Sequence, residues 1–237
     1  MVYTKQVKER DIMRDFFKYI LPCIVIILLI IISFFFFKQV SLKDNNIDKL
    51  NRDTRHSPSI GEKGSKNLII EFMDFKCPYC KKLEQTSFKK LENKKFLKKN
   101  NVELRIVNAS ILGKDSIKAA RAGHALNIYY PEKYEDFHKE LFKQQPNSER
   151  TWINNKVIDE TLDSLHIPEK KLKKIKISYK TKNSKSWKAT DKDKYLYRKY
   201  NIDYVPSVYV NGKFIKDPYK IKNIKEYLCL LYTSPSP

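Results

Sequence analysis

Two cysteines separated by two residues carry the strongest chemical signal in this sequence, in the segment Cys77-Pro78-Tyr79-Cys80. The segment follows an apolar, β-rich run at residues 67–73 and precedes apolar residues with helical spacing. A cysteine at the start of a helix faces unpaired backbone N–H groups and the positive end of the helix dipole, which favour its thiolate. Pro78 suits the first helical turn, and the spacing brings the two sulfurs within disulfide reach. The pattern therefore predicts thiol–disulfide exchange, with Cys80 resolving a mixed disulfide formed at Cys77.

The alternative role for the Cys-x-x-Cys segment is to supply two of the four ligands of a zinc site, because such a pair binds Zn²⁺ when two further Cys or His ligands are present. Cys23 lies in an apolar run and Cys229 in an atypical C-terminal segment. Three further histidines show no ligand spacing and are expected to be surface or partly buried helix residues: His124, His138 and His166. We therefore favour redox chemistry and predict neither a metal nor another cofactor. His56 is expected to be exposed and without a role.

The elements around the cysteines predict an α/β fold. Residues 67–73 and 102–107 read as buried strands, and the helix between them, from 77 to about 99, completes a βαβ unit with parallel strands. Residues 205–210 and 213–215 form a predicted hairpin, because Asn211-Gly212 supplies the two positive φ angles of a tight turn. Helices are predicted at 116–127, 134–143, 152–165, 169–179, 191–200 and 219–230.

The residues from Glu71 to Cys80 (EFMDFKCPYC) resemble the active-site stretch of DsbA-like thiol:disulfide oxidoreductases. Residues 201–212 (NIDYVPSVYVNG) resemble the later segment of that family, where a proline in cis faces the active-site disulfide. The resemblance covers about residues 66–228. It implies a thioredoxin-like fold with an inserted α-helical subdomain, here at about 113–190.

The resemblance also implies roles for individual residues. Cys77 corresponds to the nucleophile and Cys80 to the resolving thiol of a redox-active disulfide. Pro206 corresponds to the cis-proline, which leaves a backbone edge open to a substrate strand. The substrate-binding residues that it implies are Val205, Pro206, Pro78 and Tyr79. Tyr79 departs from the His of some strong oxidants, so the redox potential stays open.

Glu71 corresponds to a buried acid that assists proton transfer from the resolving cysteine. A carboxylate inside an apolar strand is costly, which independently indicates a function. The alternative is a glutamate at a strand edge that reaches solvent.

The N-terminal part of the chain predicts a membrane anchor. Residues 20–37 carry no charge and lie between Lys18 and Lys38, and as a helix they span roughly 27 Å, close to the hydrocarbon thickness of a bilayer. We expect a short tail at 1–19, an uncleaved transmembrane helix at 20–37 and a polar linker at 38–65. Residues 229–237 (CLLYTSPSP) differ in composition from the rest and resemble translated sequencing adapter, so they are expected to be an artefactual tail.

The net charge of +21, from 48 Lys and Arg against 27 Asp and Glu, invites a nucleic-acid interpretation. No zinc finger, recognition helix or aromatic-basic platform accompanies it, so we expect no nucleic-acid partner and a solvated basic surface. Basic residues are balanced on the two sides of residues 20–37, so charge does not orient the anchor.

Together these features predict a membrane-tethered, extracytoplasmic thiol:disulfide oxidoreductase that introduces disulfides into exported, reduced proteins. The resemblance implies reoxidation by a quinone-linked membrane partner of the DsbB kind. A tethered reductase or isomerase is the first alternative. A non-catalytic module that binds unfolded segments is the second.

Overall fold

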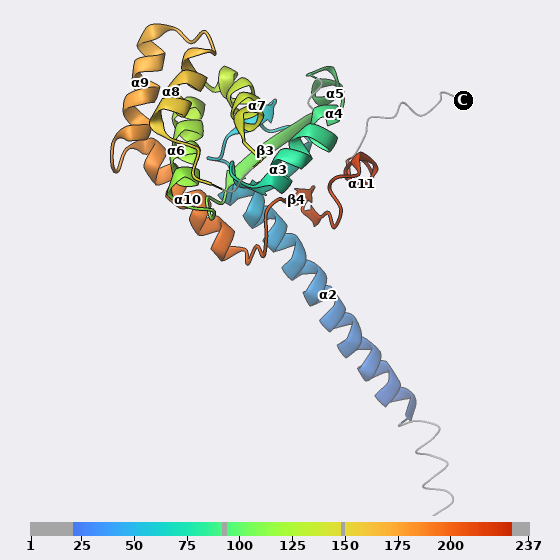
Figure 1. Cartoon of the computed structure of the whole chain (residues 1–237). Coiled ribbons are helices and arrows are strands. Elements are labelled where there is room, and N and C mark those ends of the chain that lie inside the picture. Colours follow the sequence, from blue (N-terminus) through green and yellow to red (C-terminus); the bar gives the residue numbers. More distant parts are fainter. Residues whose placement is uncertain (1–20, 92–93, 148–149, 229–237) are drawn as a thin grey trace, which may run out of the picture. The chain divides into compact units, whose positions relative to one another are not determined.

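The computed structural model describes residues 21–91, 94–147 and 150–228 (Figure 1). The chain divides into two compact units, Met1–Lys49 and Leu50–Pro237, and the second contains the whole sheet and both cysteines of the motif. The predicted tails at 1–19 and 229–237 lie outside the described residues.

Helix α2 (Leu21–Asp53) is 33 residues long and includes most of the predicted anchor. Its apolar side chains from residues 24 to 32, and the phenylalanines at 34 and 35, are exposed. Within the described ranges, no helix has both the length and the apolar character needed to cross a membrane.

The structure differs from the predicted linker at 38–65. Helix α2 continues to Asp53, and β1 (Ser59–Gly61) joins the sheet beyond it. Residues 38–53 contain no Pro or Gly to end a helix, and Leu50 is buried in an apolar cluster with Ile70 and Leu196. Burial of Leu50 against residues distant in sequence therefore makes the end of α2, from Leu50 onward, part of the second unit.

A five-stranded sheet has the strand order β1-β3-β2-β4-β5. The parallel pair predicted from the sequence is confirmed, with β2 at the centre, and both β4 on β2 and β1 on β3 are antiparallel. At the predicted turn, Asn211 and Gly212 have φ angles of 46° and 80°. The remaining strand bounds are β2 Asn67–Met73, β3 Val102–Asn108, β4 Ser207–Val210 and β5 Lys213–Phe214.

The helix predicted from residue 77 to about 99 is interrupted by a π-helical segment. Leu83 and Phe88 are both fully buried and lie five residues apart, the spacing of a π turn and not of an α-helix. The segment therefore keeps the apolar side chains on the core face. Its elements are α3 Pro78–Leu83, η2 Glu84–Phe88, α4 Lys89–Leu91 and α5 Lys94–Lys99.

The helical insertion is confirmed between β3 and β4, and it extends further than about 113–190. Helix α6 contacts each of α7, α8, α9 and α10 (Figure 1). The predicted helix at 191–200 begins earlier, because the Ser184 side chain accepts a hydrogen bond from the Trp187 N–H and caps it. The bounds are α6 Lys114–Tyr129, η3 Pro131–Lys133, α7 Tyr134–Gln144, α8 Asn155–Asp163, α9 Glu169–Lys180 and α10 Lys185–Lys199, followed after the sheet by α11 Ile221–Lys225.

Two apolar clusters lie on opposite faces of the sheet. Ile70 and Phe72 of β2 belong to the cluster that contains Leu50, whereas Ile69 and Met73 belong to the larger cluster. The larger cluster also contains the two cysteines of the motif. Because side chains alternate along a strand, Glu71 shares the face of Ile69 and Met73, on the side of the cysteines.

Candidate active site

Cys77 lies at the turn that joins β2 to α3. It is the N-cap residue of α3, in extended conformation (φ −73°, ψ 119°), and Pro78 occupies the first helical turn. Its backbone N–H donates to the Asp74 carbonyl at 3.0 Å, and its carbonyl accepts from the Lys81 N–H at 3.1 Å. The sulfur is therefore held at the helix N-terminus, as the sequence predicts.

The second motif meets the first at this point. The Cys77 thiol lies 3.5 Å from the Val205 carbonyl oxygen, to which it donates a hydrogen bond across 128 residues of sequence. The Val205–Pro206 peptide bond is cis, in agreement with the resemblance. A substrate strand that pairs with the backbone at Val205 would thus pass directly over the sulfur.

The pKa of Cys77 is lowered from 9.0 to about 7. A hydrogen bond with the Cys80 thiol is the largest cause, burial acts against it, and the backbone N–H groups of Cys80 and Tyr79 contribute further. The charge of Asp74 raises the pKa and is the smallest of these causes. The helix N-terminus thus assists ionisation, but the neighbouring thiol has the larger effect.

Cys80 has the opposite electrostatic environment. It is 1% exposed, and burial raises its pKa well above 9.0, with smaller contributions from its hydrogen bond to Cys77 and from the charge of Glu71. The two sulfurs therefore differ in acidity, so that the outer thiol ionises first and the inner one keeps its proton.

Glu71 is buried, with 2% exposure, at a central position of the sheet. It pairs with Ile106 on the parallel side and with Val208 on the antiparallel side. The strand-edge alternative is therefore wrong, and the buried acid implied by the resemblance lies close enough to influence the ionisation of Cys80.

The exposed rim of the site includes two tyrosines. Tyr79 is 63% exposed, and its carbonyl accepts a hydrogen bond from the Tyr219 hydroxyl at 3.3 Å. Burial raises the pKa of Tyr219 to about 12, with contributions from the charges of Cys80, Cys77 and Glu71. The sequence did not identify Tyr219, because it lies 140 residues from Tyr79 and no motif marks it.

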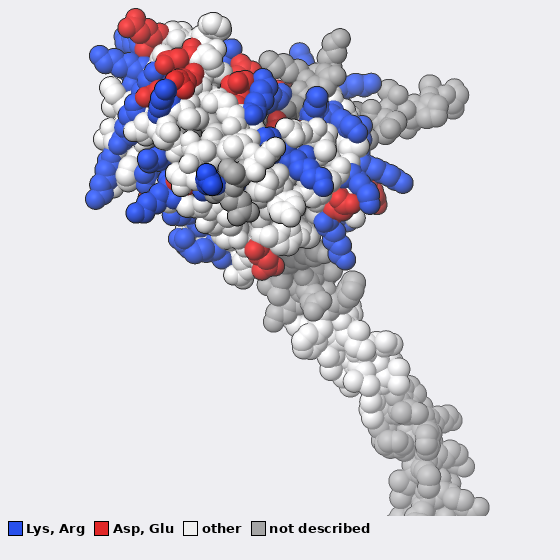
Figure 2. All heavy atoms as spheres, in the orientation of Figure 1, with Lys and Arg blue, Asp and Glu red and all other residues white. Residues whose placement is uncertain are grey.

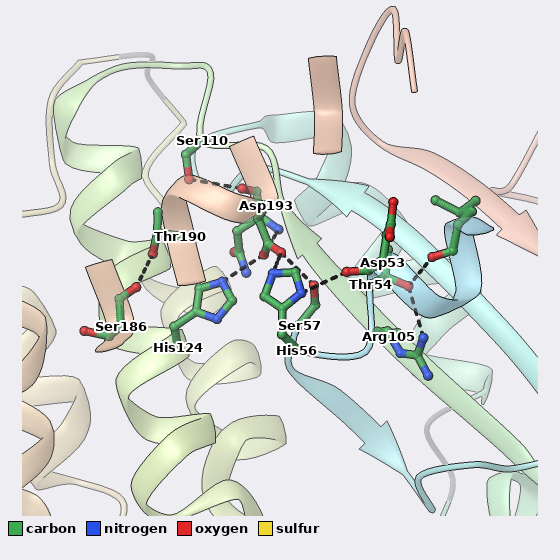
Figure 3. A network of polar contacts seen from close by, with 12 residues as sticks. Asp53, Thr54, His56, Ser57, Arg105, Ser110, His124, Ser186, Thr190 and Asp193 are labelled. Carbon is green, nitrogen blue, oxygen red and sulfur yellow. Dashed lines mark hydrogen bonds and ion pairs between the residues drawn. The ribbon is translucent and has the colours of Figure 1, made fainter. Parts of the chain in front are cut away.

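A buried polar network joins the segment after α2 to the helical insertion (Figure 3). Asp193 of α10 is fully buried, and one of its oxygens accepts from Ser57 Oγ at 2.6 Å and lies 2.9 Å from His56 Nε2. The other oxygen contacts His124 Nε2 and the Asn108 N–H, each at 2.8 Å. Figure 3 shows both imidazole rings directed at this carboxylate.

These contacts correct several expectations for histidines. His56 is not an exposed linker residue, and its ring stacks on that of His124 with centroids 6.0 Å apart. His124 and His138 are fully buried, and His138 Nε2 lies 3.2 Å from Glu84 Oε2. His166 is exposed, with a φ of 52°. In the part of the chain that the structure describes, no three His, Cys, Asp or Glu side chains form a group that could hold a metal ion.

Known proteins of similar sequence are disulfide bond formation proteins. A family model described as thioredoxin matches residues 53–229. Disulfide bond formation protein D of Bacillus subtilis (strain 168) is 32% identical over 169 residues, which are 71% of this chain and 74% of that protein. A probable disulfide bond formation protein D of Bacillus anthracis is 30% identical over 157 residues, which are 65% of this chain and 69% of that protein.

Solved structures agree with these relatives. The crystal structure of oxidised BdbD from Bacillus subtilis has a TM-score of 0.66 and 30% identity, and the match covers 73% of this chain and 91% of that chain. The thiol-disulfide exchange protein alpha-DsbA2 from Wolbachia pipientis shares the fold, with a TM-score of 0.60, 20% identity and coverage of 75% and 89% of the two chains. With its Cys-x-x-Cys turn and cis-proline in one site, this chain belongs to the thioredoxin family, as a DsbA-like thiol:disulfide oxidoreductase homologous to disulfide bond formation protein D.

Proposed function

We propose that this protein introduces disulfides into exported proteins by exchange at Cys77 and Cys80. The observation that carries the proposal is the position of the Cys77 sulfur. It lies at the N-terminus of α3, 3.5 Å from the carbonyl that precedes the cis-proline, with its pKa lowered to about 7. The relatives named as disulfide bond formation proteins support the oxidising direction.

The exchange has two steps. A substrate thiolate attacks the Cys77 sulfur of the oxidised protein, the bond between the two cysteine sulfurs breaks, and Cys80 leaves as a thiolate that takes up a proton. The second substrate thiolate then attacks the substrate sulfur of the mixed disulfide and displaces Cys77 as its thiolate. Two electrons pass from the substrate dithiol to the protein, and the substrate gains one disulfide.

The buried glutamate serves the proton transfer in this scheme. Cys80 becomes a thiolate in a site where burial and the charge of Glu71 both raise its pKa. A proton must therefore reach Cys80 as it leaves, and Glu71 is the buried acid placed on its side of the sheet. Pro206 and Val205 hold the substrate strand, and Pro78 and Tyr79 form the adjoining rim.

The Cys77 pKa of about 7 also favours a second candidate function, that of a reductase or isomerase. A strongly oxidising cysteine pair stabilises its thiolate much more, with a nucleophile pKa of about 3.5 in DsbA compared with about 7 in thioredoxin. A redox titration against glutathione separates the candidates. A potential well above that of thioredoxin, roughly −270 mV, is expected, whereas a value close to it would refute the oxidase.

Activity assays test exchange itself. The oxidised protein should oxidise a dithiol peptide, and the Cys77→Ser variant should not. If the variant loses no activity, or if the wild type binds unfolded peptides without oxidising them, the non-catalytic binding module is the better description. Insulin reduction by the reduced protein, if faster than peptide oxidation, would favour the reductase.

The proposal places the catalytic domain outside the cytoplasm, on a tether formed by residues 20–37. Its support is the uncharged stretch in the sequence and the need of a stable disulfide donor for an oxidising compartment. A membrane partner of the DsbB kind would take the two electrons and restore the disulfide. Labelling of Cys77 in intact cells by a membrane-impermeant thiol reagent is the test, and labelling only after lysis would place the site inside.

A further inference from the structure

A pocket of about 440 Å³ opens one residue from the nucleophile. It is lined by Lys76, Pro78, Lys81 and Lys82 of the active-site segment and by residues that follow α7, Gln145 among them. Pro78 directly follows Cys77, so a peptide that presents its cysteine to this sulfur brings its neighbouring side chains to the pocket.

The charge of the pocket is positive and only partly neutralised. Lys76 has a carboxylate partner outside the lining, Asp115, at 3.1 Å. Lys82 lies over the Tyr219 ring, 5.1 Å from its centroid. Lys81 donates to the Gln145 carbonyl at 2.5 Å, which uses one of its three N–H groups. Within the described ranges neither Lys81 nor Lys82 forms an ion pair with a carboxylate.

The wall of the pocket is fixed to the active-site turn. The carbonyl of Gln145 accepts from Lys81, and the Gln145 side-chain amide donates to the Phe75 carbonyl at 3.3 Å. Gln145 is buried, with 5% exposure. These bonds hold the end of α7 against residues on both sides of Cys77, so the pocket exists before a substrate arrives and little ordering is needed on binding.

We propose that this pocket is a subsite for an acidic side chain next to the reacting cysteine of the substrate. A carboxylate there would accept charge-assisted hydrogen bonds from Lys81 and Lys82, the two ammonium groups that lack a carboxylate partner. The charge of the surrounding surface also attracts a carboxylate. Lys and Arg are spread over the face shown in Figure 2, where acidic side chains form only small groups. This inference rests on the proposed exchange function, and it names the class of substrate that the site prefers.

The test uses dithiol peptides that are identical except for the residue beside one cysteine, which is Glu, Gln or Lys. The measurement is the second-order rate constant of oxidation by the oxidised full-length protein. We expect the Glu peptide to react about two- to fivefold faster than the Gln peptide, since a partly exposed ion pair contributes no more than that. The Lys peptide should be the slowest, and salt should reduce the differences.

Matched variants locate the effect. In the Lys81→Gln/Lys82→Gln double variant the Glu-to-Gln rate ratio should fall close to one, and the Lys81→Arg/Lys82→Arg variant should retain it. Lys170→Gln/Lys174→Gln removes the same charge from two exposed lysines of α9 and should leave the ratio unchanged. Thermal unfolding of each variant confirms that it is folded.

Three results would overturn the subsite while exchange activity persists. They are equal rates for the Glu and Gln peptides in the wild type, a preference retained without Lys81 and Lys82, and an equal loss in the α9 control, which would indicate the general field of the surface. Failure to oxidise any of the peptides would instead refute the proposed function.

Discussion

Replacement of Cys80 by Ala tests what keeps the Cys77 sulfur ionised. The hydrogen bond with the Cys80 thiol is the largest of the causes that lower the pKa of Cys77 from 9.0 to about 7, ahead of the backbone N–H groups at the start of α3. We therefore expect Cys80→Ala to raise that pKa by about one unit or more. Cys80→Ser, which keeps a donor at this position, should raise it less.

The effect on the reaction rate of Cys77 depends on two opposing quantities, the fraction of the sulfur that is thiolate and the nucleophilicity of that thiolate. With a pKa of about 7, about 10% of Cys77 is thiolate at pH 6, and with a pKa of about 8 only about 1% is. A more basic thiolate is a better nucleophile, by about threefold per pKa unit. The Cys80→Ala variant should therefore react about threefold more slowly than wild type at pH 6 and about threefold faster at high pH, with the two curves crossing at about pH 7.5.

The assay is the rate of alkylation of Cys77 by iodoacetamide between about pH 5 and pH 10, followed by mass spectrometry of the reduced protein. Circular dichroism of each variant controls for folding. A midpoint that stays at about 7 in Cys80→Ala would show that the Cys80 thiol does not stabilise the Cys77 thiolate, and it would assign the ionisation to the helix N-terminus alone. An equal shift in Cys80→Ala and Cys80→Ser would show that packing of the sulfur, and not its S–H group, is responsible.

Three further predictions concern the acid behind the site, the polar network and the turn before β2. Glu71→Gln should lower the pKa of Cys80, because the charge of Glu71 raises it; a ¹³C chemical-shift titration of the Cys80 Cβ measures this, and an unchanged value would exclude the coupling. Burial alone would raise the pKa of Asp193, but its two histidine partners hold it below the usual 3.8. That carboxylate therefore stabilises the fold above pH 4, and the contribution is lost as the pH falls. Asp193→Asn should lower the free energy of unfolding, measured with urea at neutral pH, by about 3–5 kcal/mol. Below pH 4 the stability of the variant should depend less on pH than that of the wild type. If the two proteins lose stability equally as the pH falls, the prediction is wrong. Gly64 has a φ of 79° and faces open space, so Gly64→Ala should cost about 1–2 kcal/mol for the left-handed backbone alone. Gly61→Ala should destabilise the domain by clearly more, because an added Cβ there would lie 2.5 Å from a main-chain carbonyl oxygen of β3. Equal urea midpoints for the two variants would show that the backbone of β3 shifts to accommodate the added Cβ at little cost.

The parts of the site that were predicted correctly depend on local sequence. The Cys-x-x-Cys segment lies between a β-rich run and a helix that begins with Pro78, and neither feature needs a distant partner. The turn at Asn211 and Gly212 is local in the same way, because positive φ angles suit these two residue types. Five of the seven residues at 67–73 are apolar, and they lie on both faces of the strand, which fits a central strand of the sheet.

The features that were missed depend on contacts between distant residues. His56 and Ser57 read as part of a polar linker, yet both meet Asp193, and Ser57 is 136 residues from it. His138 finds Glu84 across 54 residues, at the point where the π turn replaces the expected α-helix. No local sequence pattern identifies such partners. A buried charge is stable only where the fold brings a partner close to it, and here that partner is distant in the sequence.

The amino-acid sequence alone determined the chemistry of this protein, two sulfurs with the right spacing at the start of a helix, and the elements that hold them. The tertiary structure decided how acidic each sulfur is and what a substrate meets around them. Acidity depends on burial, on the Cys80 thiol and on Glu71, and the access route depends on Val205, 128 residues away from Cys77. Spacing along a chain specifies which groups are present, whereas electrostatic interaction depends on distance in space, which only the folded chain defines.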